Sequence, residues 1–172
     1  LITGSVNFIL IDSLYSTSES FPITINPLNG STRANHVKFT VDSARASVSI
    51  EGSAIPALLV FNGTTNFEWN GLSNSGNRAI TISNASSAAS SAVIYLSSTL
   101  AAPLDSVIVR GLRVVGGSNT VTSTFGIHAG GATISTAGTG DAMNAVHILD
   151  NEVYNAYYGI YLRGSIANQA KN

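Results

Sequence analysis

The stretch Val107-Ile108-Val109-Arg110-Gly111-Leu112 decides the fold, because its pattern occurs three times in the chain. Forty residues earlier the chain has Phe67-Glu68-Trp69-Asn70-Gly71-Leu72, and 39 residues later it has Val146-His147-Ile148-Leu149-Asp150-Asn151. Each copy places two apolar residues two positions apart and then a turn, as in a short, half-buried strand. Repetition at nearly constant intervals indicates stacked structural repeats.

A second series of short apolar segments interleaves with the first. It comprises Ala92-Val93-Ile94-Tyr95-Leu96, Phe125-Gly126-Ile127-His128 and Tyr158-Gly159-Ile160-Tyr161-Leu162, at intervals of 33 residues. Turn dipeptides such as Asn62-Gly63 and Gly116-Gly117 bound these runs. The two series together predict one strand, a turn and a second strand in each repeat, joined by loops of variable length.

These patterns predict an all-β fold, a right-handed parallel β-helix (solenoid) in which equivalent strands stack about 4.8 Å apart. We expect roughly six to seven coils of about 20–25 residues, in one domain that spans residues 1–172. A β-sandwich with antiparallel pairing is the alternative, but its strands should average five or six residues. Turn asparagines can form ladders between coils, with Asn62, Asn70 and Asn151 as candidates. The inner columns should bury Ile80, Ile82, Val107, Val109, Val146, Ile148 and Ile160.

The composition excludes several classes of protein. Only 10% of the 172 residues are charged and the formal net charge is −1, so nucleic acid is excluded as a partner, since that surface needs a basic excess. No apolar run reaches the ~18 residues of a membrane span. The chain has no cysteine for disulfides or thiolate metal sites. Ser, Thr and Asn number 55 together and suit a β-rich protein with many turns, as in secreted bacterial proteins.

Several segments are characteristic in combination, namely residues 6–15, 19–23, 59–63, 67–71, 150–153 and 158–161. Together they resemble the right-handed, pectin-lyase-like parallel β-helix repeats of very large secreted or surface proteins of Bacteroidota-type bacteria. The resemblance covers about residues 6 to 165 and implies an extracellular fragment of a longer chain. The same fold serves pectate lyases, polygalacturonases, phage tailspikes and adhesins, so it does not by itself set a function.

The acidic residues are scattered, and the pair Asp150 and Glu152 is the best candidate for a cation or sugar site. Their spacing would put both carboxylates on one strand face, with Asn151 pointing inward. A solvated turn is the expected role, and a weak calcium or sugar site is the alternative. The acidic motifs of polygalacturonases and the basic catalytic residue of lyases are missing, so we expect no catalytic residue, no cofactor and no other metal ligand.

Tyrosines are the second candidate group. If Ile160 points inward, Tyr161 points outward, and with Tyr157 and Tyr158 it would form an aromatic stripe that contacts sugar rings. Packing against a neighbouring loop or subunit is the alternative. We expect His128 and His147 to be solvent-facing strand residues, without a metal-binding spacing. Salt bridges on the surface are the expected role of Arg110 and Arg113.

We therefore expect a structural or adhesive module of a secreted or cell-surface protein, without catalysis. The alternative is a β-helix that binds or cleaves polysaccharide, with its missing residues outside this chain. Unpaired strand edges at the ends of a β-helix also favour association with a second copy, which could build fibres, or with neighbouring domains of the same chain.

Overall fold

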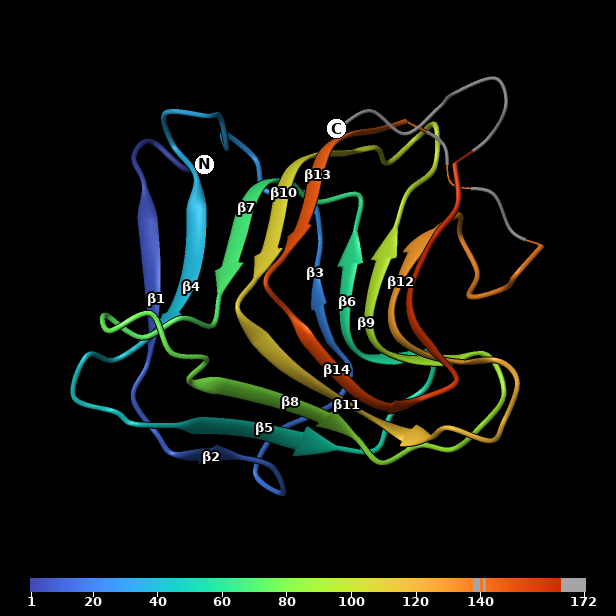
Figure 1. Ribbon diagram of the computed structural model, residues 1–172. Helices are drawn as coiled ribbons and strands as arrows, with labels where there is room; N and C mark the ends of the chain where they lie inside the picture. Colours follow the sequence, from blue (N-terminus) through green and yellow to red (C-terminus); the bar gives the residue numbers. More distant parts are fainter. Residues whose placement is uncertain (138–139, 141, 165–172) are drawn as a thin grey trace.

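The computed structural model describes residues 1–137, 140 and 142–164, which form fifteen strands in three parallel sheets (Figure 1). Sheet A contains β1 (Val6–Leu10), β4 (Val37–Val41), β7 (Thr65–Asn70), β10 (Leu104–Arg110) and β13 (Met143–Leu149). Sheet B contains β2 (Leu14–Tyr15), β5 (Val48–Gly52), β8 (Ile80–Asn84), β11 (Leu112–Ser118) and β14 (Glu152–Ala156). Sheet C contains β3 (Ile23–Ile25), β6 (Ala57–Asn62), β9 (Ser91–Ser97), β12 (Thr124–Gly130) and β15 (Tyr158–Leu162).

The chain passes through sheets A, B and C in this order five times, so the fold is a parallel β-helix. Every strand pairs in parallel with the equivalent strand of the coil before or after it. The three sheets form three sides of the solenoid in Figure 1. No helix occurs among the described residues, and hence none that is long and apolar enough to cross a membrane.

The repeat spacings are confirmed, but the number of coils is wrong. Val107 pairs with Phe67 on one side and with Val146 on the other, as the motif copies predicted. The structure has five coils instead of six to seven. The coils are longer than expected because loops such as residues 98–103 and 131–142 lie between strands that we had counted as near neighbours.

Side chains of successive coils stack in columns inside the solenoid, which is where the core lies. Phe8, Phe39 and Trp69 form one such column, with ring centroids 4.7 and 4.8 Å apart. These distances match the spacing of paired strands, about 4.8 Å. Register therefore turns equivalent sequence positions into continuous columns of buried rings.

Most of the residues predicted for these columns are buried, and two are not. Ile80, Ile82, Val107, Val109 and Val146 are buried. The prediction was wrong for Ile148, which is half-buried, and for Ile160, which is 51% exposed. Both lie in the last described coil, so they contact a preceding coil but no following one among the described residues.

Turn residues connect neighbouring coils, although only one predicted asparagine pairs with another. The Asn62 amide donates to Asn26 Oδ1 at 3.0 Å. Asn151 instead bonds the backbone of the previous coil, accepting from Leu112 N at 3.0 Å and donating to Val109 O at 2.9 Å. The Asn70 side chain accepts from Leu72 N within its own turn. Turn asparagines thus mainly satisfy backbone groups that the bends leave open.

Candidate binding groove

A groove of about 480 Å³ lies on the outer face of sheet A. Side chains alternate between the faces of a strand. Register therefore places Lys38, Glu68, Ile108 and His147 in one outward column across β4, β7, β10 and β13. Residues of this column and of the loop before β4 form the walls: Arg33, His36, Asn66, Phe67, Glu68, Ser106, Ile108, Ala145 and His147.

An unusual backbone conformation recurs in the floor of the groove. Asn66, Ser106 and Ala145 have φ values of 50°, 55° and 46°, in the left-handed region that non-glycine residues rarely adopt. They occupy the same position in β7, β10 and β13, just before the paired residues Phe67, Val107 and Val146. Such a conformation costs on the order of 1–3 kcal/mol, and strain of this kind clusters at functional sites.

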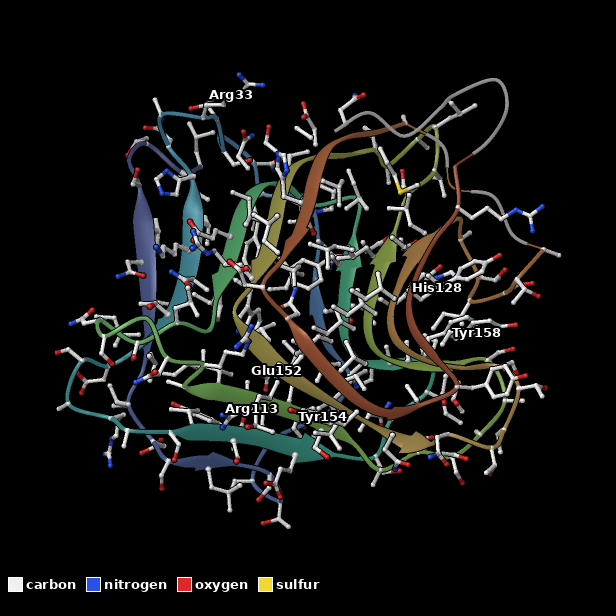
Figure 2. The ribbon with its side chains drawn as sticks, viewed as in Figure 1. Arg33, Arg113, His128, Glu152, Tyr154 and Tyr158 are labelled. Atoms are coloured by element: carbon white, nitrogen blue, oxygen red, sulfur yellow. The ribbon has the colours of Figure 1, made fainter. Side chains whose placement is uncertain are left out.

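The charges around the groove leave a surplus of cationic groups. Glu68 is the one carboxylate among the described wall residues, and Lys38 Nζ lies 3.4 Å from its Oε1. Arg33 is exposed on the loop that leads into β4, in the upper part of Figure 2. His36 is fixed beside the first coil because its carbonyl accepts from Val6 N at 3.0 Å. With Glu68 balanced by Lys38, the wall offers a guanidinium and the imidazoles of His36 and His147.

The groove is the better of two large hollows as a site. The other, of about 450 Å³, lies between the β4–β5 and β7–β8 loops and is lined by small polar residues with Arg45 as the one charged group among those described. Its serine and asparagine side chains bond one another, as Ser73 does with Ser75 at 2.9 Å. These groups already have partners within their own loop, whereas the walls of the groove come from several coils.

Asp150 and Glu152, predicted as a pair, lie on different structural elements. Asp150 is in a turn with φ of 53°, and Glu152 begins β14. Glu152 contacts Arg78 at 3.1 Å and Arg113 at 3.3 Å, and it accepts from the Tyr154 hydroxyl at 2.9 Å. These groups, with Tyr154 first, hold the pKa of Glu152 below its usual range. The carboxylate is thus engaged within the protein, and the expected surface salt bridge of Arg113 is present.

The predicted tyrosines lie over sheet C, apart from Glu152 (Figure 2). Tyr158 stacks on Phe125 with centroids 5.1 Å apart, and Tyr157 contacts Tyr158 edge-on at 5.0 Å. The Tyr161 ring stacks on His128, and its hydroxyl donates to Thr136 O at 2.9 Å. Tyr157 is about half exposed, while Tyr158 and Tyr161 pack against neighbouring residues. These residues and the Asp150–Glu152 segment therefore form no common site.

The prediction that His128 faces solvent was wrong. His128 does point outward from sheet C, but it has no exposed surface because residues 131–137 cover it. His147, on sheet A, is half-buried in the wall of the groove. Arg110 also differs from expectation, since its Nε is buried and has no hydrogen-bond partner among the described residues.

The groove residues themselves were missed, although part of the signal was present. Glu68 and His147 occupy the same position in two copies of the repeat that decides the fold, so their common column could have been found. Arg33 and His36 come from a loop without a repeat. No cluster of three or more His, Asp or Glu residues suited to a metal ion occurs in the described part of the chain.

No family model, curated protein or solved structure matches this chain. The parallel β-helix is shown by the strand pairing alone. The resemblance to pectin-lyase-like repeats of Bacteroidota-type bacteria has no support from relatives and stays a prediction.

Proposed function

We propose that the chain is a non-catalytic adhesive module of an extracellular or cell-surface protein, and that the groove over sheet A binds a polysaccharide. The observation that carries this proposal is the groove itself, with hydrogen-bonding side chains from four adjacent strands and the preceding loop. Four strands at a spacing of about 4.8 Å span about 14 Å, long enough for several sugar units laid across them.

The chemistry of the walls favours a polysaccharide with acidic groups. Arg33, His36 and His147 supply cationic or hydrogen-bonding nitrogen atoms, and the one wall carboxylate, Glu68, is already paired. Ile108 gives an apolar patch at the centre of the column, where the carbon face of a sugar can pack. A single carboxylate paired with a lysine offers no acid–base couple for glycoside hydrolysis, which ordinarily uses two carboxylates. The arrangement therefore favours binding over cleavage.

Binding of the 172-residue chain to a panel of neutral and acidic oligosaccharides tests this proposal. We expect Arg33→Ala and His147→Ala to weaken the binding of an acidic glycan about tenfold each, which corresponds to about 1.4 kcal/mol. Arg45→Ala is the matched control, because Arg45 is an exposed arginine outside the groove. The proposal fails if no glycan binds, or if Arg45→Ala weakens binding as much as Arg33→Ala does.

A second candidate function is assembly of copies through the first coil. Phe8, Ile9, Ile11 and Leu14 are each about half exposed there, and β1, β2 and β3 have a partner strand on one side only among the described residues. Unpaired parallel edges with apolar side chains are templates for pairing.

Sedimentation of the chain at increasing concentration tests assembly. We expect species larger than the monomer, which the double substitution of Ile9 and Leu14 by Lys abolishes. Leu100→Lys is the control, since Leu100 is exposed in the β9–β10 loop and away from the first coil. A monomer at every concentration contradicts this second candidate.

A further inference from the structure

Residues 131–137, called the strap here, follow β12 and fold over the outer face of sheet C. Ile134 is buried in a cluster with Tyr95 and Phe125. The carbonyl oxygens at both ends of the strap accept from side chains below, Gly131 from the Tyr95 hydroxyl and Thr136 from the Tyr161 hydroxyl and the Arg163 guanidinium. The strap is thus held by one apolar side chain and a few hydrogen bonds.

His128 lies directly beneath the strap, without exposed surface. Its ring stacks on Tyr161 with centroids 5.5 Å apart, and it contacts Phe125 edge-on at 4.8 Å and Tyr95 edge-on at 5.5 Å. A side chain at Gly130 would place its Cβ 2.7 Å from His128 Cε1, so glycine makes room for the imidazole. His128 is therefore enclosed by aromatic rings on the sheet side and by the strap above.

The hydrogen bonds of His128 suit only the neutral ring. Its Nε2 is 3.3 Å from Ser135 O in the strap, and because a carbonyl can only accept, Nε2 carries the proton. Its Nδ1 is buried and has no hydrogen-bond partner among the described residues. Protonation at Nδ1 would therefore create a buried donor without an acceptor, which costs free energy.

No counter-charge is available to a protonated His128 from the elements packed against it. β9, β12, β15 and the strap contain no carboxylate. The titratable and charged groups that face it are the Tyr95 hydroxyl from β9, the Tyr161 hydroxyl from β15, and Arg163 just after β15. Arg163 is a cation, so it opposes a second positive charge below the strap.

We propose that protonation of His128 opens the strap, so that mild acidification releases residues 131–137 from sheet C and uncovers Tyr95, Phe125 and Tyr161. An opened strap admits water to the imidazolium and removes the unmet donor. The device is independent of the groove on sheet A, because the strap and His128 belong to sheet C.

The direction of the pH dependence follows from the closed state. Burial lowers the pKa of His128 there, and the hydrogen bond to Ser135 offsets this in part. In the open state the imidazole regains its ordinary pKa of about 6.5. The closed strap is therefore fully favoured above about pH 6.5 and loses up to about tenfold in its closed-to-open ratio per pH unit below it, until the closed-state pKa is reached.

Hydrogen exchange of the strap amides, corrected for the intrinsic pH dependence of exchange, measures this opening. From pH 6.5 to pH 5.5 we expect the opening constant of the wild-type strap to rise several-fold, up to about tenfold. In His128→Gln the opening constant should not change with pH, whatever its absolute value. His147→Gln, which changes a histidine outside sheet C, should keep the wild-type response. A strap indifferent to pH, or a response that persists in His128→Gln, overturns the proposal.

A measurement on the unsubstituted chain keeps the test valid if His128→Gln does not fold. The chain has three histidines, so NMR signals of the imidazoles can be assigned with His36→Gln and His147→Gln. We expect the strap amide shifts to titrate together with the His128 ring, below its ordinary pKa of about 6.5. Strap amides that stay unchanged while His128 titrates overturn the proposal.

Discussion

Sheets A and C present equivalent outward positions, yet one outer face is open and the other is covered. His147 on β13 stands half-buried in the wall of an open groove, whereas His128 on β12 has no exposed surface. Register alone decides that both histidines point outward, since each precedes or follows an inward isoleucine or valine. The strap, part of the β12–β13 loop, makes the difference. Loops therefore determine whether an outward residue meets a ligand, water or a buried shell.

The largest expected effect lies inside sheet A and shows how little its outer face contributes to stability. Trp69 is fully buried in the aromatic column, so Trp69→Ala should reduce the free energy of unfolding by about 3–5 kcal/mol. Ile108→Ala, on the outer face of the same sheet, should cost less than about 1.5 kcal/mol because its side chain is already partly exposed. Urea unfolding measures both losses, and equal losses would contradict an open outer face.

A second expected effect breaks the covered face. Ile134 is the apolar side chain of the strap that enters the aromatic cluster. Ile134→Ala should weaken strap closure by about 2 kcal/mol, roughly a thirtyfold rise in the opening constant measured by hydrogen exchange. Thr133→Ala, at an exposed position one residue earlier, should leave strap exchange unchanged. Equal exchange in the two variants would show that Ile134 does not hold the strap.

A third, smaller effect compares the two outward histidines directly. His128→Ala should lower thermal stability by about 1–2 kcal/mol, because it leaves a void beneath the strap. His147→Ala should change stability by less than about 0.5 kcal/mol, as is usual for a partly exposed residue. Calorimetry at neutral pH measures both. A larger loss for His147→Ala would reverse our assignment of open and covered faces.

The smallest effect concerns sheet B, whose outer face is neither grooved nor strapped but carries an ion-pair cluster. The Tyr154 hydroxyl is the first cause of the lowered pKa of Glu152, so Tyr154→Phe should move this pKa up towards its usual range. Tyr157→Phe should leave it unchanged, since Tyr157 contacts Tyr158 instead. Carboxyl NMR titration measures the shift. An unaltered Glu152 titration in Tyr154→Phe would contradict this cause.

The sign of the Glu152 contribution follows from its lowered pKa. The group stabilises the folded state at pH values above its unfolded pKa of about 4.3, and this contribution is lost as the pH falls through the folded-state value. Because Glu152 is on the surface, salt should weaken the contribution.

The repeats predicted register better than they predicted surfaces. Spacings of 39–40 residues on sheet A and 33 on sheet C correspond to the observed pairs of Val107 with Phe67 and Val146, and of Ile127 with Ile94 and Ile160. Periodic apolar residues encode these pairs locally, because stacking demands like beside like. The number of coils was harder to predict, since the first coils do not carry recognisable copies of the motif.

The candidate groove divides in the same way. Glu68 and His147 belong to the repeat, so their alignment is implicit in its register. Arg33 and His36 reach the groove from a loop, and the burial of His128 depends on the path of another. A loop path is set by tertiary contacts such as those of Ile134, which have no periodic trace in the sequence.

Each strand of this β-helix pairs only with strands of the coils next to it, and this makes the molecule nearly one-dimensional. Stability is then close to a sum of neighbouring interfaces, so unfolding can begin at an end coil and advance one coil at a time. The longer coils differ from the shorter ones mainly in loop residues outside the strands. Insertions and deletions in these loops would thus leave the ladder in register, which lets such a chain vary its surface loops while its backbone stack stays the same.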